Sequence, residues 1–253
     1  MSSALDSPLT VFAVSLVVQW LSAYLGYFLG RSGQHLSNEA HDDLETVQTA
    51  ALTLLALIIG FSFSMAVTRY DQRKNYEEAE ANAIGTEYVR ADLLPVQDAE
   101  HLRGLLKRYL DERVSFYQER DERQIGQIDS DTAKLQAELW SAVSGAANQR
   151  PTAVAALAVS GMNDVLNSQG YTQAAWWNRI PVAAWGLMGL MAVCNNLLLG
   201  YGERRKSMLL LLVLPVIISI AFMLIADIDS PRGGIIRILP HNLIALSQSV
   251  KVR

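Results

Sequence analysis

The chain has 253 residues, of which 51% are hydrophobic and 18% are charged, and its mean hydropathy is +0.17. This composition is more apolar than that of an ordinary soluble domain, so it indicates a membrane protein. The net charge of −4 and the scattered basic residues argue against nucleic acid as a partner. The single cysteine, Cys194, excludes an intramolecular disulfide and a thiolate metal site within the chain.

Four stretches are long and apolar enough to cross a bilayer, whose hydrocarbon core of about 30 Å requires about 20 helical residues. They cover residues 8–29, 47–67, 181–199 and 208–226. The first stretch lacks the basic start and the cleavage site of a signal peptide, so we expect it to be retained. The predicted fold class is therefore all-α, an integral membrane protein with four transmembrane helices.

A polar block between the second and third spans, from residue 68 to 178, is predicted to be helical throughout. The helix of the second span is expected to continue out of the membrane into this block, until Pro95 ends it near Leu94. Apolar residues at helical spacing predict a further helix that begins near Leu102. The segment "GQIDSD" is expected to break that helix, after which Asp129 or Ser130 would cap the next one.

The chain is thus expected to have four parts. These are a first transmembrane hairpin (1–68), a helical cytoplasmic domain (69–179), a second transmembrane hairpin (180–227) and a cytoplasmic C-terminal tail (228–253). Basic residues near span ends favour the cytoplasmic side, and more of them flank the polar block than the opposite ends of the spans. We therefore expect a multi-pass membrane protein with both termini and the polar block in the cytoplasm. The basic residues on the block's side are Arg69, Arg73, Lys74, Arg179, Arg232 and Arg237, and those on the other side are Arg31, Arg204, Arg205 and Lys206.

The second span carries small, hydroxyl and apolar side chains at spacings of three and four, which place them on one helical face. The spacing Gly60-xxx-Ser64-xxx-Thr68 would let helices pack closely in lipid, with Gly60 as the central packing residue. Alternatively, this face turns to the axis of a symmetric homo-oligomer and lines a pore that is gated by bulky apolar rings. The candidate pore-lining residues are Thr53, Leu57, Phe61, Ser64 and Thr68.

Charged residues follow directly after the second span. Arg69, Asp71 and Arg73 belong either to a solvated segment that fixes the topology or to a ring of charge at a cytoplasmic pore mouth. Because Arg69 and Asp71 have opposite signs, the sequence does not select between anions and cations.

Two aspartates, Asp227 and Asp229, end the fourth span, where negative charge opposes the helix dipole and requires partners. Arg232, Arg237 and the arginines after the second span are the available cations. We expect an ion-pair anchor formed by Asp227, Asp229 and Arg232, with an acidic cation-binding ring as the alternative.

Enzyme chemistry is not supported by the sequence. The four histidines are scattered, and no zinc-protease motif, nucleophile elbow or phosphate-binding glycine loop is present. We therefore predict a protein that is not an enzyme, with no cofactor and no metal site.

The stretch "LLALIIGFSFSMAVTRYDQRK" resembles the second transmembrane helix of bestrophins, where a Gly-Phe pair precedes an Arg-aromatic step at the same distance as Gly60-Phe61 precedes Arg69-Tyr70. Asn82 in "EEAEANAIG" lies near a position where bestrophins also have an asparagine-containing helix. The chain from Leu44 to Arg237 is more similar still to the bacterial bestrophin-like domain proteins. The segments that carry this likeness are "EANAIGTEYVRADLLP", "NRIPVAAW", "GYG" and "DIDSPRGGIIR".

The resemblance to bestrophins implies a homopentameric chloride-type anion channel with a helical cytoplasmic region, and the likeness to the bacterial family implies the bacterial inner (plasma) membrane. It also implies an apolar neck at Thr53, Leu57 and Phe61, with membrane lipid and inorganic ions as partners. Thr53 is polar where an apolar residue is expected, Tyr70-Asp71 replaces paired tryptophans, and no acidic cluster follows the fourth span as a calcium site would require. The ion selectivity therefore stays open. The alternative function is a non-conducting membrane scaffold or sensor that acts through its helical cytoplasmic domain.

Overall fold

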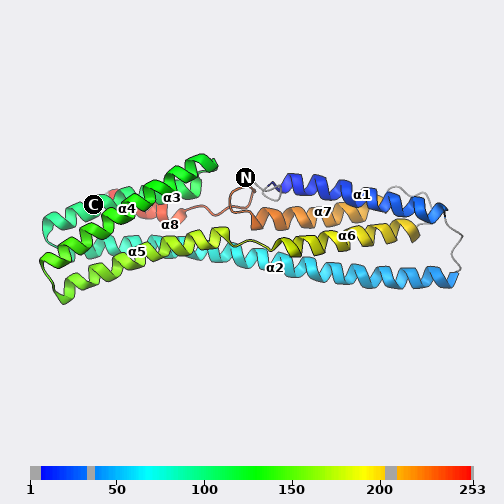
Figure 1. The fold of residues 1–253 in the computed structure, drawn as a ribbon, viewed down its shortest axis with the longest axis horizontal. Coiled ribbons are helices and arrows are strands. Elements are labelled where there is room, and N and C mark those ends of the chain that lie inside the picture. Colours follow the sequence, from blue (N-terminus) through cyan, green and yellow to red (C-terminus); the bar gives the residue numbers. More distant parts are fainter. Residues whose placement is uncertain (1–6, 33–37, 203–209, 252–253) are drawn as a thin grey trace. The chain divides into compact units, whose positions relative to one another are not determined.

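The computed structural model describes residues 7–32, 38–202 and 210–251, and the chain divides into two compact units. The first unit comprises Met1–Tyr70 and Arg179–Arg237, and the second comprises Asp71–Asn178 and Ile238–Arg253. Every regular element of the described residues is a helix, which confirms the predicted all-α class (Figure 1). Helix α2 (Asn38–Arg90) contributes its first part to the first unit and the remainder to the second, so the predicted continuation of the second span is also confirmed.

The first unit is formed by α1 (Pro8–Ser32), the first part of α2, α6 (Val182–Gly202) and α7 (Leu210–Asp229), with α1 packed against both α6 and α7. Four helical stretches of the described chain are long and apolar enough to cross a membrane, and each overlaps one predicted span. The predicted start of the fourth span and the basic residues Arg204, Arg205 and Lys206 lie outside the described residues. The four stretches are Pro8–Arg31, Ala40–Leu93, Ala153–Gly202 and Leu211–Asp229.

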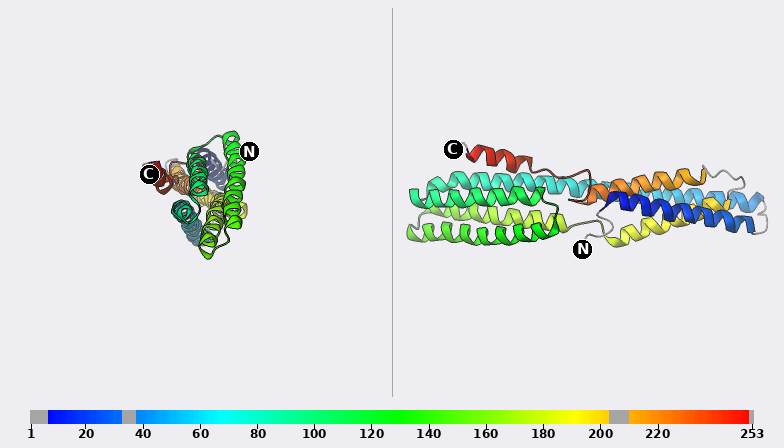
Figure 2. Two further views of the ribbon diagram at one scale, coloured as in Figure 1. Left: turned by 90° about the vertical axis from the view of Figure 1, so that its left-hand side faces the viewer. Right: turned by 90° about the horizontal axis from the view of Figure 1, so that it is seen from above.

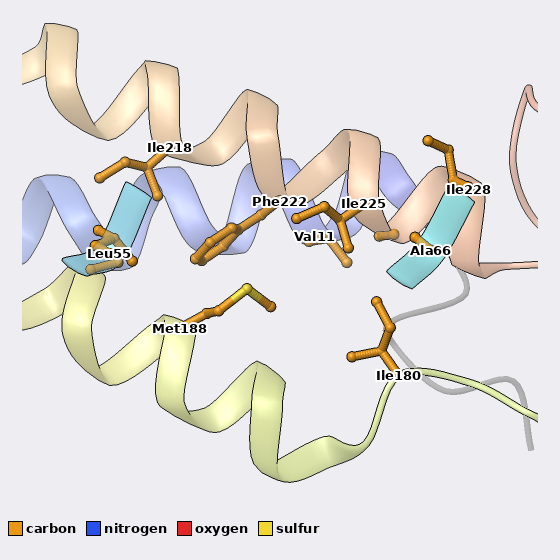
Figure 3. Close-up of a cluster of buried hydrophobic side chains, with 11 residues drawn as sticks. Val11, Leu55, Ala66, Ile180, Met188, Ile218, Phe222, Ile225 and Ile228 are labelled. Atoms are coloured by element: carbon orange, nitrogen blue, oxygen red, sulfur yellow. The ribbon is translucent and has the colours of Figure 1, made fainter. Parts of the chain in front are cut away.

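Apolar side chains from all four of these helices meet in the core of the first unit (Figure 3). Phe222 lies near the middle of the cluster and packs its ring edge-on against Trp185 of α6, with 6.1 Å between the ring centroids. Helix α2 contributes Leu55 and Ala66, so this core determines which face of α2 is turned inward. The buried members are Val11, Leu55, Ala66, Ile180, Met188, Ala192, Ile218, Phe222, Ile225, Ala226 and Ile228.

Helices α1 and α6 approach so closely that glycine is required at their contact. A Cβ atom on Gly26 would lie 2.0 Å from the carbonyl oxygen of Leu197, and one on Gly200 would lie 1.9 Å from that of Ala23. One turn further along α1, a Cβ on Gly30 would lie 2.5 Å from the carbonyl oxygen of Tyr201. Gly26 and Gly30 thus form a small-xxx-small motif on the first span that packs α1 against α6.

Three buried polar side chains connect α1, α6 and α7 near the same contact. Gln19 Nε2 donates to Ser219 Oγ at 3.2 Å, and Asn196 Nδ2 donates to Gln19 Oε1 at 3.1 Å. All three residues are buried, and in lipid such groups have no water with which to bond. The network therefore fixes the register of the three helices against one another.

The second unit contains the remainder of α2, the 3₁₀ turn η2 (Ala91–Leu93), α3 (Val96–Gln118), α4 (Glu122–Gln149), α5 (Ala153–Trp177) and α8 (His241–Lys251). Helix α3 packs on α4 and α8, and α4 packs on α5 (Figure 2). The helical path of α2 ends just before Pro95, as predicted, and α3 begins at the next residue. The C-terminal helix α8 is therefore part of this unit's packing.

The predicted break at "GQIDSD" is wrong, because those residues lie inside α4. The break comes earlier, where the Asp121 side chain accepts a hydrogen bond from the backbone N–H of Arg123 at 3.0 Å and caps the new helix. Gly126 costs about 1 kcal/mol relative to Ala inside a helix. The buried stripe of Leu135, Leu139 and Val143 further along α4 outweighs that cost.

A buried ion pair lies at the centre of the second unit. Glu80 of α2 pairs with Arg113 of α3, and both side chains are fully buried. The second carboxylate oxygen of Glu80 accepts hydrogen bonds from Tyr117 at 3.2 Å and from Thr172 of α5 at 3.1 Å. Burial, reinforced by the charge of Glu80, raises the pKa of Tyr117 above its usual range. Breaking such a pair leaves an uncompensated buried charge, so α2, α3 and α5 are held together here.

The close contact between α1 and α6 predicts that a larger side chain at Gly200 destabilises the protein. The substitution Gly200→Ala should lower the free energy of unfolding by about 1–3 kcal/mol, because its Cβ would overlap the backbone of α1. Gly189→Ala on the same helix is the matched control, because no atom lies within 4 Å of its added Cβ. Thermal unfolding in detergent measures both, and equal stability of the two variants would contradict the contact.

Candidate functional site

The candidate site is the exposed face of α2 in the first unit, formed by Thr53, Leu57, Gly60, Phe61, Ser64 and Thr68 and called the outer face here. All of these residues are exposed. The two large apolar side chains among them, Leu57 and Phe61, are 52% and 64% exposed. Exposed apolar residues on a membrane-spanning helix face either lipid or another protein surface.

The opposite face of α2 is turned into the core of the unit. Leu55, Ser62 and Ala66 are at most 3% exposed. At about 100° per residue, these three positions lie on the side of the helix opposite to the outer face. Helix α2 is therefore two-sided, with one face packed inside the chain and the other left open by the described part of it.

Two hydroxyl groups of the outer face, those of Thr53 and Thr68, bond within their own helix. Thr53 Oγ1 donates to the carbonyl oxygen of Thr49 at 2.8 Å, and Thr68 Oγ1 donates to that of Ser64 at 2.9 Å. Each hydroxyl proton is thus used internally, while the oxygen lone pairs stay available as acceptors on the surface. Around Gly60 no atom of the described chain lies within 4 Å of an added Cβ, so its predicted packing role would require a partner from outside the described residues.

The three charged residues after the span have different surroundings. Asp71 is exposed, whereas Arg73 is 1% exposed and donates to the carbonyl oxygens of Ala175 and Asn178, both at 3.0 Å. Arg73 thereby satisfies carbonyl groups at the C-terminal end of α5, where a cation is favoured. Arg69 lies 4.0 Å from Asp229, and its side chain is 14% exposed. Asp71 is the one of these three that lies on the open surface.

The two aspartates at the end of α7 are bound mainly by backbone amides. Asp227 accepts from the N–H of Ile235 at 2.7 Å and from that of Ile236 at 3.0 Å. Asp229 accepts from the N–H of Ile180 at 3.1 and 3.2 Å, in addition to its contact with Arg69. These donors compensate negative charge at a helix C-terminus, and the ion-pair anchor of Asp227, Asp229 and Arg232 stays a prediction.

Arg232, the predicted third member of the ion-pair anchor, is partly buried in the segment after α7. Nearby, a Cβ on Gly234 would lie 2.2 Å from Asp227 Oδ1, so glycine is needed for the chain to close around this carboxylate. The sequence could not reveal these partners, because backbone N–H groups are donors at every residue and only the folded path selects among them. Within the three described ranges, no group of three or more His, Cys, Asp or Glu side chains could hold a metal ion.

Nearly the whole chain matches one protein family. A family model for the Bestrophin-like domain matches residues 10–243. The chain belongs to the Bestrophin-like domain family. This confirms the resemblance seen in the sequence and extends it over nearly the whole chain. No curated protein matches the sequence of this Bestrophin-like chain.

Solved structures share the fold of this Bestrophin-like chain. A bacterial Bestrophin homolog from Klebsiella pneumoniae, in a mutant form, is 14% identical with a TM-score of 0.67, over 97% of this chain and 96% of that one. A second structure of the Klebsiella pneumoniae homolog is 15% identical with a TM-score of 0.62, over 94% and 95% of the two chains. A third, described as a membrane protein, is 15% identical with a TM-score of 0.63, over 95% and 94%. At such low identity, these likenesses establish a shared fold.

Substitutions at Asp229 test whether its contacts stabilise the end of α7. Asp229→Ala should lower the free energy of unfolding by about 1–3 kcal/mol, because the Ile180 N–H loses its acceptor and Arg69 loses its counter-ion. Asp229→Asn keeps an acceptor oxygen and should cost less. Asp71→Asn is the exposed control and should leave the stability unchanged, as measured by thermal unfolding of the purified protein. A loss as large for Asp71→Asn as for Asp229→Ala would contradict the assigned contacts.

Proposed function

We propose that this protein is a homopentameric, bestrophin-like ion channel of the bacterial inner membrane, with the outer face of α2 lining its pore. The observation that carries the proposal is the two-sided burial of α2. Leu55, Ser62 and Ala66 are packed inside the chain, while the opposite face is open and combines hydroxyl groups with two bulky apolar side chains. Membership of the Bestrophin-like domain family and the shared fold with bacterial Bestrophin homologs support the same conclusion.

A ring of such faces around an axis would have the composition that a narrow pore requires. Phe61 and Leu57 lie one turn apart and would form an apolar neck that controls conduction by dewetting. Thr53, Ser64 and Thr68 would expose hydroxyl oxygens to hydrated ions on either side of that neck. Because every residue of the outer face is uncharged, we expect the neck to discriminate ions by the cost of dehydration rather than by charge.

Close approach between neighbouring subunits would take place at Gly60, where a single chain leaves open space. A small residue beside Phe61 would allow the pore helices to crowd around the axis. We place the cytoplasmic mouth at Asp71, the exposed charged residue after the span. Arg69 and Arg73 would instead stabilise that end of the pore helix through Asp229 and through the end of α5. Both termini and the second unit would then be cytoplasmic.

The alternative is a non-conducting membrane scaffold or sensor that acts through its helical cytoplasmic domain. It would share the four spans, and it could share the oligomer, but it would lack an open axis. Conductance separates the two functions, whereas oligomeric state alone does not. A strictly monomeric protein in nanodiscs would contradict the axial pore.

The pore assignment is tested by recording the purified protein in planar bilayers under ion gradients. Phe61→Ala should raise the single-channel conductance severalfold, because it removes the bulkiest ring from the neck. Leu57→Ala should act in the same direction. Reversal potentials in the same recordings would identify the permeant ion.

Phe63→Ala provides the matched control for Phe61→Ala. It removes the same ring from the same helix, but residue 63 points about 200° away from residue 61. Phe63 is 37% exposed and therefore also accessible for substitution. If Phe61→Ala and Leu57→Ala leave the conductance unchanged, or if Phe63→Ala changes it equally, α2 does not line the pore as proposed.

A further inference from the structure

Glu87 of α2 is a fully buried carboxyl group in the second unit. It follows the predicted end of the second span by 20 residues, which is about 30 Å along a helix and places it outside the apolar span. Its side chain is 0% exposed, and neither carboxylate oxygen has a hydrogen-bond partner in the described part of the chain. A buried charge without partners is strongly disfavoured, so the environment selects for the neutral acid.

The carboxyl group lies against Gly161 of α5 and shares that space with an arginine. A Cβ on Gly161 would lie 2.1 Å from Glu87 Oε2 and 2.3 Å from Arg90 Nη1. Arg90 is one turn further along α2, and its Nη1 lies 3.8 Å from Oδ2 of Asp164 on α5. Asp164 is 66% exposed and Arg90 is 33% exposed, so this ion pair is at the surface. One arginine therefore stands between a solvated carboxylate and a buried carboxyl group.

The charged groups that act on Glu87 come from the two helices that meet there. Burial is the largest effect and raises the pKa of Glu87 from its ordinary value of 4.5 to about 8, while Arg90 lowers it and Asp164 raises it. On η2, which packs against α5, Asp92 is paired with Arg103.

Helix α8 meets α2 through Leu246, which would contact a Cβ on Gly85 at 3.0 Å. Its ionisable residues in the described range, His241 and Lys251, are exposed at the two ends of the helix. Neither of them is among the groups that shift the titration of Glu87.

We propose that Glu87 is a proton-controlled switch in the second unit. As a neutral acid it stays buried against Gly161, and as a carboxylate it draws Arg90 away from Asp164 and loosens the packing of α2 on α5. The bistable element is the Arg90 side chain, which has two carboxylates within its reach. The switch does not depend on ion conduction, so it would operate in a channel and in a scaffold alike.

The sign of its effect on stability follows from the raised pKa. The contribution of neutral Glu87 is fully present below its ordinary value of 4.5 and is lost as the pH rises to about 8. Glu87→Gln keeps the shape of the neutral acid and cannot ionise. The melting temperature of the wild type should therefore fall relative to that of Glu87→Gln between about pH 5 and about pH 8, and the difference should stay constant above that range.

Infrared difference spectroscopy of the full-length protein in nanodiscs tests the switch directly. The carbonyl stretch of a protonated carboxylic acid should disappear with a midpoint near pH 8. This band should be missing from Glu87→Gln and kept in Glu78→Gln, an exposed control on the same helix. Its absence from the wild type, or its persistence in Glu87→Gln, would overturn the proposal.

Two variants that leave Glu87 in place test the role of Arg90. Asp164→Asn releases Arg90 from its partner, so the midpoint should shift to lower pH. Arg90→Gln removes the cation that Glu87 would recruit, so the midpoint should shift to higher pH. An unchanged midpoint in both variants would show that Arg90 does not exchange between the two carboxylates and would contradict the switch.

Discussion

The structure of the first unit depends on one constraint: one face of α2 packs in the core of the chain, while its opposite face stays exposed. Leu55 and Ala66 of α2 pack in the core formed with α1, α6 and α7, whereas the residues on the opposite side of the helix lie outside that core. A helix buried on one side alone would be expected to carry large lipid-facing side chains elsewhere. The outer face instead has glycine and hydroxyl residues among its apolar ones. This combination suits a protein-lined or water-lined surface better than hydrocarbon.

The rest of the first unit stabilises that orientation. The glycine contact between α1 and α6 and the network of Gln19, Asn196 and Ser219 fix three of the four helices, and the apolar cluster then fixes the rotation of α2 against them. At the end of the span, Arg69 and Asp229 join α2 to α7. Rotating α2 would expose its core residues and break this contact, so the outer face is determined by packing inside a single chain.

In the second unit, α2 packs against its neighbours through buried polar side chains. Three of its acidic residues, Glu77, Glu80 and Glu87, are buried and have different surroundings. Glu77 accepts hydrogen bonds from the first amides of α8, Glu80 pairs with Arg113, and Glu87 lies against Gly161. Two of these carboxylates are satisfied and serve packing, whereas the third is not, and that difference is what marks Glu87 as a switch rather than a structural group.

Much of the fold could be predicted from the sequence because it depends on local patterns. The length of the apolar stretches indicated the four spans, and the absence of Pro between Tyr76 and Leu94 indicated that α2 continues beyond its span. The spacing of the residues from Thr53 to Thr68 placed them on one face. Periodicity could also have revealed Gly26-xxx-Gly30, but which small residues meet depends on the neighbouring helix.

Other features could not be predicted because they arise from tertiary contacts. Arg73 looks like its neighbours in the sequence, and it is buried because the end of α5 comes to lie beside it. The backbone amides of Ile235 and Ile236 donate to Asp227, and only the folded path of the chain selects these two donors. The start of α4 was misplaced because Asp121 and Asp129 are equally good caps in isolation, and the structure places the cap at Asp121.

The central claim, that the outer face of α2 lines a pore, is tested most directly by accessibility during conduction. Cys194 would first be replaced by serine, and Ser64→Cys or Phe63→Cys would then be introduced and treated with a charged, membrane-impermeant thiol reagent. Modification at residue 64 should reduce the current, whereas modification at residue 63 should leave it unchanged. A current that is insensitive to modification at residue 64, or equally sensitive at residue 63, would contradict the assignment.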